Sequence, residues 1–198
     1  MRAAGAGLPS LLWSLGGGRV PPEADRPGTG ALVHHVDVAR LINLASRAGL
    51  HLVVDLDSVD GLRADEEAAF FLVRRLGVRA VVTKHGGVAA ALAERGVPAL
   101  LHVHALDSTG LERTLAGHPR TPGMGTAVSP GVVLPYLGRA DREGLPRPLL
   151  ACGLVRTEAE VAACRRAGAD SVARLPAAGF PNEDLDMAAR RSSNRSRS

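Results

Sequence analysis

The residues best suited to chemistry in this chain lie in the segment ACGLVRTEAE, which runs from Ala151 to Glu160. Gly153 follows a short apolar run and lets a ligand approach the backbone. Thr157, with Glu160 three residues later, has the spacing of a capping box at the start of a helix. Free N–H groups at a helix start favour anions, and Arg156 adds a positive charge beside them. These residues predict a phosphate-binding turn at Gly153, Arg156 and Thr157.

Histidines suggest a second chemistry. His102 and His104 alternate onto one face of a predicted strand, as two metal ligands would. Three further histidines lie near predicted strand ends, namely His34, His35 and His85. An H-x-H pair is a non-specific pattern, however, and polar residues at the rim of a fold explain it equally well. We therefore predict no metal site.

A third chemistry is acid–base or Schiff-base catalysis by Asp57 and Lys84, which follow two neighbouring predicted strands. A lysine that is removed from water can act as a nucleophile or a base. Nothing in the sequence around Lys84 indicates such removal, and an anion-binding role fits it as well. Capping of a loop by Asp57 is the simpler alternative for the carboxylate.

The elements that must position these residues alternate regularly. Apolar runs predict strands at residues 31–35, 51–57, 78–83, 98–105, 125–130, 149–152 and 170–173. Helical patterns lie between them at residues 37–48, 64–76, 86–95, 108–117, 131–137 and 157–167. Such alternation is typical of a parallel sheet covered by helices, with its working residues at the carboxyl ends of the strands.

The apolar segment from Leu8 to Leu12 can supply an eighth strand, whereas residues 16–30 have almost no apolar content and predict a loop. We therefore expect an α/β fold, a small (β/α)8 TIM-like barrel with parallel strands. A doubly wound open sheet is the alternative.

Charge is concentrated at the C-terminus. The 198 residues include 24 basic and 20 acidic side chains. Four arginines and no acid lie in the final segment, at Arg190, Arg191, Arg195 and Arg197. Without those four, the rest of the chain has 20 basic and 20 acidic residues and is formally neutral. We predict a barrel domain over residues 1–178 and a disordered basic Ser/Arg tail over 179–198, with any RNA contact confined to these four arginines.

Composition also limits the location of the chain and the roles of its two cysteines. Cys152 and Cys164 lack metal or redox spacing and read as buried apolar residues. No apolar run reaches the roughly 18–20 residues that a membrane span needs. The apolar segment Leu8–Leu15 has no convincing cleavage site after it, so we expect a cytoplasmic protein without a secretory signal.

Five segments together carry a resemblance to a known family. They are DSVDGLRADE (57–66), VVTK (81–84), ALDS (105–108), SPGV (129–132) and GLVRTEAEV (153–161) with AGA at 167–169. In this order and spacing the chain resembles the glycerol uptake operon antiterminator regulatory proteins, also called glycerol-3-phosphate responsive antiterminators. The resemblance implies a (β/α)8-like barrel, no catalytic turnover, no cofactor, glycerol 3-phosphate as the effector, and regulation of glycerol-utilisation genes through leader mRNA.

The family pattern transfers to five of the predicted ligand residues, and three others stand where the family has different groups. The matching residues are Asp57, Gly131, Gly153, Arg156 and Thr157. Lys84, His102 and Arg174 replace family residues and could bind an anion in a different way. These eight form the predicted site for glycerol 3-phosphate or a related polyol phosphate.

Two other functions stay open at this stage, and so does the association of copies into a homo-oligomer. One is a TIM-barrel enzyme acting on a phosphorylated small molecule. The other is a partner-binding module whose pocket has been lost, with the tail as its active part.

Overall fold

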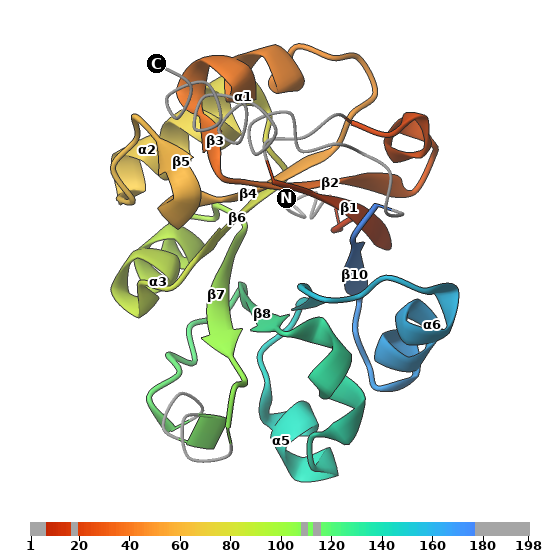
Figure 1. The fold of residues 1–198 in the computed structure, drawn as a ribbon. Coiled ribbons are helices and arrows are strands. Elements are labelled where there is room, and N and C mark those ends of the chain that lie inside the picture. The colour runs from red at the N-terminus through yellow and green to blue at the C-terminus, as the bar shows by residue number, and fades with distance from the viewer. Residues whose placement is uncertain (1–6, 17–19, 108–110, 113–115, 177–198) are drawn as a thin grey trace, which may run out of the picture.

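Eight parallel strands close into a barrel in the computed structural model, which describes residues 7–16, 20–107, 111–112 and 116–176. Around the barrel the strands follow the order β1, β10, β9, β8, β7, β6, β4, β2, and β2 pairs with β1 to complete the ring. Their bounds are β1 Leu11–Gly16, β2 Thr29–His34, β4 Leu52–Asp55, β6 Ala80–Thr83, β7 Ala99–His104, β8 Met124–Ser129, β9 Leu149–Ala151 and β10 Ser171–Arg174. The helices lie outside the ring (Figure 1). The predicted barrel is therefore confirmed, and the open sheet is excluded.

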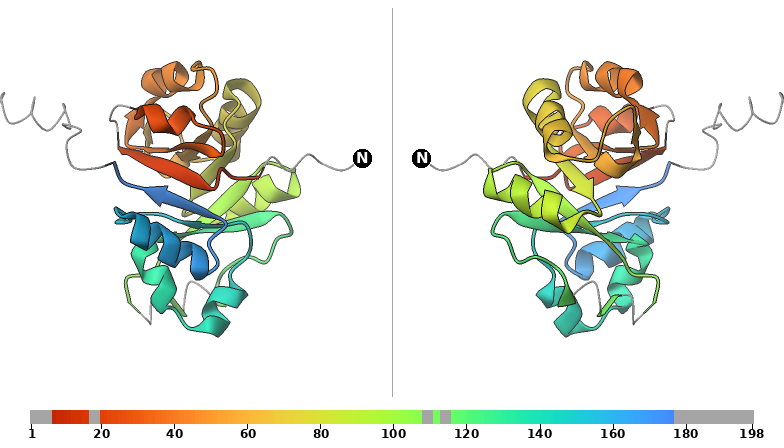
Figure 2. Two further views of the ribbon diagram at one scale, coloured as in Figure 1. Left: turned by 90° about the vertical axis from the view of Figure 1, so that its right-hand side faces the viewer. Right: turned by 90° about the vertical axis from the view of Figure 1, so that its left-hand side faces the viewer.

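Helical segments connect the strands and cover their outer faces (Figure 2). The α-helices are α1 Val38–Ala45, α2 Glu66–Phe70, α3 Gly86–Glu94, α5 Arg139–Gly144 and α6 Glu158–Arg166. Tighter or wider turns form η1 Pro22–Asp25, η2 Leu56–Ser58, the π-helical η3 Phe71–Arg75 and η4 Gly131–Tyr136. A short parallel pair, β3 (Val36–Asp37) and β5 (Val59–Asp60), follows β2 and β4.

Alternation along the strands divides the core into an inner and an outer part. Small and medium side chains fill the barrel, among them Leu12, Val53, Val82 and Ala173. The residues between them point outward and pack under the helices in two further clusters. Every second residue of a strand points into the barrel. The residue two positions after the last inner residue therefore points into the mouth at the carboxyl end of the strand.

Several local predictions are confirmed by the backbone. Thr157 accepts a hydrogen bond from the Glu160 N–H, and the Glu160 carboxylate accepts from the N–H groups of Thr157 and Arg156, so the capping box is complete. Asp37 caps α1 through the N–H of Arg40. Cys152 and Cys164 are free and buried, as predicted.

The predicted loop over residues 16–30 is wrong in part. Gly16 is the last residue of β1, residues 22–25 form the turn η1, and β2 already begins at Thr29. Gly30 lies in β2, and its backbone packs against His51, the residue before β4. A Cβ at this position would come within 2.3 Å of the His51 carbonyl oxygen. This close contact favours glycine in the strand. Because glycine has no apolar side chain, a search for apolar runs does not find the start of β2.

Two further differences concern helices. The predicted helix over residues 64–76 is an α-helix only to Phe70 and then widens into the π-helical segment η3. Helix α5 was not predicted because its sequence, RADREG, has no buried residue to produce an apolar period. The predicted helix over 108–117 falls largely outside the described residues, as does the predicted tail. In the described part of the chain, no helix is long and apolar enough to cross a membrane.

Candidate functional site

A pocket of about 220 Å³ opens at the carboxyl-end mouth of the barrel. It is small beside the roughly 300–1,000 Å³ of ordinary ligand sites, so it suits a ligand of few atoms. Polar side chains converge on it from several strands. Its described lining is Ser14, Leu32, His34, His35, Asp55, Val82, His102, Ser129, Cys152 and Gly153.

Strand geometry explains why these residues meet. His34, Asp55 and Ser129 are the last residues of β2, β4 and β8, and each lies two positions after an inner residue of the barrel. Ser14 follows the inner Leu12 in the same way. Parallel strands bring their carboxyl ends to one rim, and therefore residues far apart in sequence share the pocket.

Two histidines of β7 form a cluster with the serine of β8. The Ser129 hydroxyl lies 2.9 Å from His102 Nε2 and 3.1 Å from His104 Nδ1. The two rings lie against one another, with centroids 4.2 Å apart. On the opposite wall, Ser14 Oγ lies 3.0 Å from His34 Nε2. The predicted sharing of one strand face by His102 and His104 is thus confirmed.

Burial controls the ionisation of the pocket. It lowers the pKa of His102 to about 4, with a further decrease from the neighbouring His104. It also lowers the pKa of His34, with His35 as the second cause, and raises the pKa of the Asp55 carboxyl, with Asp57 as the second cause. Burial also raises the pKa of the Cys152 thiol to about 12. His102 and His34 are therefore neutral near pH 7.

Backbone conformation at the rim is unusual at two non-glycine residues. His35 and Leu154 have φ values of +51° and +61°, in the left-handed region that side chains with a Cβ rarely adopt. The His35 N–H is held by the Ser58 hydroxyl at 3.2 Å. Such residues concentrate at ligand-binding sites, where surrounding contacts maintain the strain.

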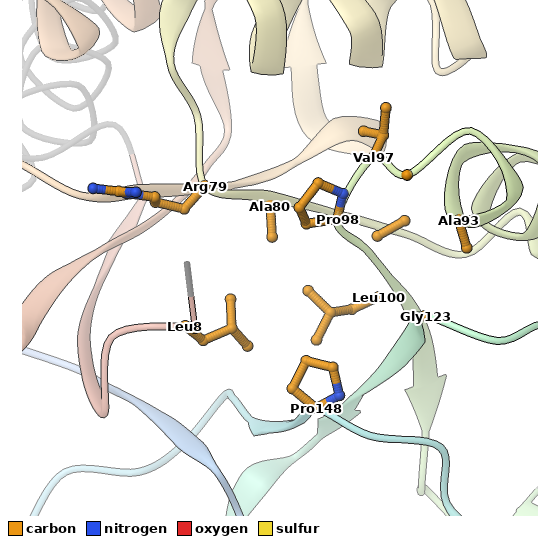
Figure 3. A pocket seen from close by; sticks show the side chains of 12 residues that line it. Leu8, Arg79, Ala80, Ala93, Val97, Pro98, Leu100, Gly123 and Pro148 are labelled. Carbon is orange, nitrogen blue, oxygen red and sulfur yellow. The ribbon is translucent and has the colours of Figure 1, made fainter. Parts of the chain in front are cut away.

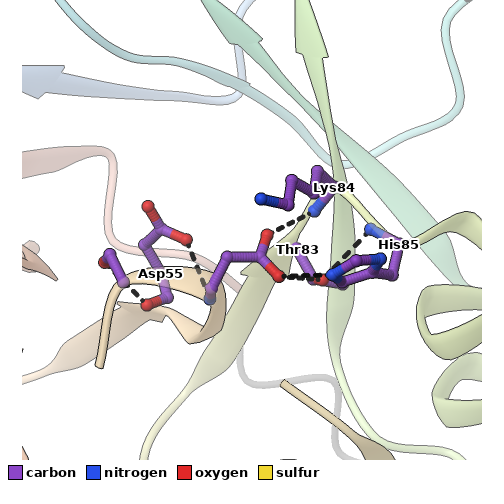
Figure 4. Close-up of polar contacts among 6 residues, drawn as sticks. Asp55, Thr83, Lys84 and His85 are labelled. Carbon is purple, nitrogen blue, oxygen red and sulfur yellow. Dashed lines mark hydrogen bonds and ion pairs between the residues drawn. The ribbon is translucent and has the colours of Figure 1, made fainter. Parts of the chain in front are cut away.

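Asp57, in the turn η2 after β4, acts as a clamp on the end of β6, where Thr83, Lys84 and His85 lie (Figure 4). Its carboxylate accepts hydrogen bonds from the Thr83 hydroxyl at 3.0 Å and the Lys84 N–H at 2.6 Å, and it lies 3.3 Å from His85 Nε2. Both oxygens thus have protein partners, which favours the loop-capping interpretation of this residue. Lys84 is exposed at the rim, whereas a Schiff-base lysine is activated by removal from water. The enzyme alternative gains no supporting geometry here.

The predicted phosphate turn at Gly153 and Thr157 already holds an anion of the protein itself. The Glu160 carboxylate accepts from the N–H groups of Arg156 and Thr157 at 2.7 and 2.8 Å, and these hydrogen bonds lower the pKa of Glu160. Gly153 itself lines the mouth pocket, with a φ of +80° that favours glycine. Of this turn, only Gly153 therefore lines the pocket, and the Glu160 carboxylate occupies the N–H groups at the start of α6.

Gly131 and Arg174 have protein partners and do not themselves line the pocket. The Gly131 N–H donates to the carbonyl oxygens of Cys152 at 2.5 Å and Gly153 at 2.9 Å, and a Cβ at Gly131 would come within 2.8 Å of the Cys152 nitrogen. Arg174 points outward from β10, where it pairs with Glu158 and lies over the Trp13 ring at 5.4 Å.

The eight predicted ligand residues are therefore not all brought together. His102 and Gly153 line the pocket, Lys84 and Asp57 lie at its rim, and the other four lie outside its lining. Arg190, Arg191, Arg195 and Arg197 fall outside the described residues. Sequence reasoning left Ser14, His34 and Asp55 out of the site, although an alternation count along each strand would have found them. No group of three or more metal-ligating side chains exists in the described ranges.

A larger cavity of about 380 Å³ lies at the opposite, amino-terminal end of the barrel (Figure 3). Its walls include Leu8, Val97, Pro98 and Leu100, and Arg79 is the only charged residue among its described lining. Converging polar groups, rather than volume, identify a binding site, and barrel proteins place such sites at the carboxyl end. The smaller mouth pocket is therefore the candidate site.

Comparison with known proteins gives a family and two structural neighbours. Residues 31–175 match the family described as glycerol-3-phosphate responsive antiterminator. A glycerol uptake operon antiterminator regulatory protein from Listeria monocytogenes has a similar fold, with a TM-score of 0.68, 19% identity, and coverage of 86% of this chain and 93% of that one. A glycerol uptake operon antiterminator-related protein from Thermotoga maritima gives a TM-score of 0.66, 25% identity, and coverage of 87% and 96%. No curated protein matches the chain.

Proposed function

This chain belongs to the glycerol-3-phosphate responsive antiterminator family, and we propose that it is a non-enzymatic regulator of glycerol utilisation that senses glycerol 3-phosphate and acts on leader mRNA. The match over residues 31–175 carries the proposal, because it includes every strand of the barrel except β1 and the start of β2. The mouth pocket supports it, since its size suits a small polyol phosphate.

The pocket chemistry is compatible with such a ligand. Hydroxyls of Ser14 and Ser129 and the imidazoles of His34 and His102 can hydrogen-bond the hydroxyl and phosphate oxygens of glycerol 3-phosphate. Lys84 is exposed and stands outside the described lining of the pocket. Asp57 and the α6 helix start serve the barrel instead, by joining strand ends and capping a helix.

Thermal unfolding of the full chain with glycerol 3-phosphate tests the sensing claim. A ligand at 100 times its Kd adds about 2.7 kcal/mol of stability by mass action. For a chain of this size that corresponds to an increase of roughly 5–10 °C in Tm. Glycerol, which lacks the phosphate, is the matched control and should give no shift. An unchanged Tm with glycerol 3-phosphate and with a panel of polyol phosphates contradicts the sensing claim.

The RNA claim rests on the family and on the charge of the C-terminal segment. We propose that Arg190, Arg191, Arg195 and Arg197 make the RNA contacts, because the rest of the chain is formally neutral. An RNA selected from a structured pool against the full chain should lose binding when residues 188–198 are deleted. Four phosphate contacts predict a log–log salt slope of about −3. Salt-insensitive binding by the truncated chain contradicts this assignment.

A further inference from the structure

The mouth pocket lacks a permanent cation for the anion that the proposed function requires. Among the described residues that line it there is no lysine or arginine, and its one carboxylate is Asp55. A phosphate monoester carries a charge of about −1.5 to −2 near pH 7. Placing that charge beside Asp55 in a half-buried pocket is unfavourable unless positive charge enters with it.

The His102–Ser129–His104 cluster is built to accept a proton. In its neutral form, one ring donates to the Ser129 oxygen and the serine hydroxyl donates to the other ring, which satisfies the contacts of 2.9 and 3.1 Å. After one proton is added, both rings donate to the two lone pairs of Ser129 Oγ. The serine O–H is then released from the cluster and can donate to a phosphate oxygen in the pocket.

We propose that a phosphate-bearing dianion binds in the barrel mouth together with one proton, which the His102–Ser129–His104 cluster takes up, so that affinity for the ligand increases as pH falls. This inference rests on the proposed function, which supplies the dianionic ligand. It makes the protein a sensor whose response to glycerol 3-phosphate depends on pH.

Other ionisable groups around the cluster limit how the proton is assigned. Asp55 reaches the pocket from β4, and Cys152 lines it just after β9. Asp57 and His85 lie at the clamp, and Lys84 follows β6. His34, the last residue of β2, and the next residue, His35, also line the pocket. Asp55 is the main competitor, because a carboxyl whose pKa burial has raised could also bind a proton when an anion arrives. The test must therefore separate imidazole from carboxyl.

Calorimetric titration of the full chain at pH 7.5, in two buffers of different ionisation enthalpy, counts the protons taken up on binding. The probes are glycerol 3-phosphate and inorganic sulfate, a dianion that does not titrate in this range. We expect uptake of about one proton with either probe. The Kd for glycerol 3-phosphate should decrease up to about tenfold from pH 8 to pH 7, and it should level off below about pH 6, where the ligand itself gains a proton.

Three variants assign the proton. Replacing both rings, in His102→Gln/His104→Gln, keeps hydrogen-bonding groups near Ser129 and should reduce uptake to near zero. The single variant His104→Gln alters only the exposed ring and should reduce uptake while leaving the fold intact. His51→Gln, at the amino-terminal end of the barrel, should leave uptake unchanged.

The outcomes distinguish this inference from the proposed function. Binding of glycerol 3-phosphate without proton uptake overturns the inference and leaves the proposed function standing. Sulfate binding with uptake, but no response to glycerol 3-phosphate, supports the inference and contradicts the proposed ligand. Loss of uptake in Asp55→Asn, with uptake retained in the double histidine variant, overturns the assignment to the cluster.

Discussion

Burial of His102 predicts that the protein loses stability in mild acid. The pKa of this imidazole is about 4 in the folded chain against an ordinary value of 6.5. The unfolded chain therefore binds a proton more readily between these values. Because the folded pKa is the lower one, stability is unaffected above about pH 6.5 and decreases as pH falls toward 4.

The size of the effect follows from the two pKa values. Lowering the pH from 8 to 5 costs up to about 2 kcal/mol from His102 alone. Because the side chain is only half-buried, water screens part of this, and we expect about 1–2 kcal/mol. His34 contributes in the same direction, since its pKa is also lowered. Asp55 opposes both, because a raised carboxyl pKa makes the folded chain the better proton acceptor.

Urea unfolding of the wild type and of His102→Gln at pH 8 and pH 5 isolates the contribution of this one ring. The wild type should lose about 1–2 kcal/mol more than the variant between the two pH values. His51→Gln is the control and should behave as the wild type does. Equal losses in the wild type and His102→Gln would refute the claim that the His102 ring is buried and neutral.

Three further predictions concern the supports of the pocket. Gly131→Ala should lower the free energy of unfolding in urea by roughly 1–3 kcal/mol, because its Cβ would meet the Cys152 nitrogen at 2.8 Å. Gly87→Ala, whose Cβ would have no atom within 4 Å, is the control and should be neutral or stabilising. Equal effects of the two substitutions would contradict the packing role of Gly131. The Cys152 thiol, buried and with its pKa raised to about 12, should resist iodoacetamide at pH 8 until the chain unfolds, and rapid labelling of the native protein, detected by mass spectrometry, would count against its burial. Thr157→Ala should cost about 1 kcal/mol through loss of the helix cap, yet it should leave the calorimetric Kd for glycerol 3-phosphate unchanged. A large loss of affinity in this variant would return the ligand to the α6 turn.

The fold was predictable because its signals are local and repeated. Apolar runs of Ala, Leu and Val mark the strands, and capping residues such as Asp37 and Thr157 mark helix starts. The prediction failed where backbone contact replaced side-chain pattern, as at Gly30, and where a helix has no buried face, as in α5. Those features depend on neighbours that are distant in the sequence.

The site was predictable only in part, for a related reason. The sequence shows which residues follow a strand. It does not show whether their side chains point into the barrel mouth or toward another side chain of the protein. Arg174 follows the outer face of β10 and pairs with Glu158, and Asp57 turns its carboxylate to Thr83 and Lys84. The predicted capping box and the predicted phosphate site compete for the same N–H groups at the start of α6, and in the structure the Glu160 carboxylate occupies them.

A crystal structure of the full chain with glycerol 3-phosphate is the most direct test of the mouth pocket as the ligand site. We expect the phosphate in this pocket, within hydrogen-bond distance of Ser129 and His102. A phosphate on the N–H groups at the start of α6, or a ligand in the apolar cavity beside Arg79 at the other end, would contradict this expectation.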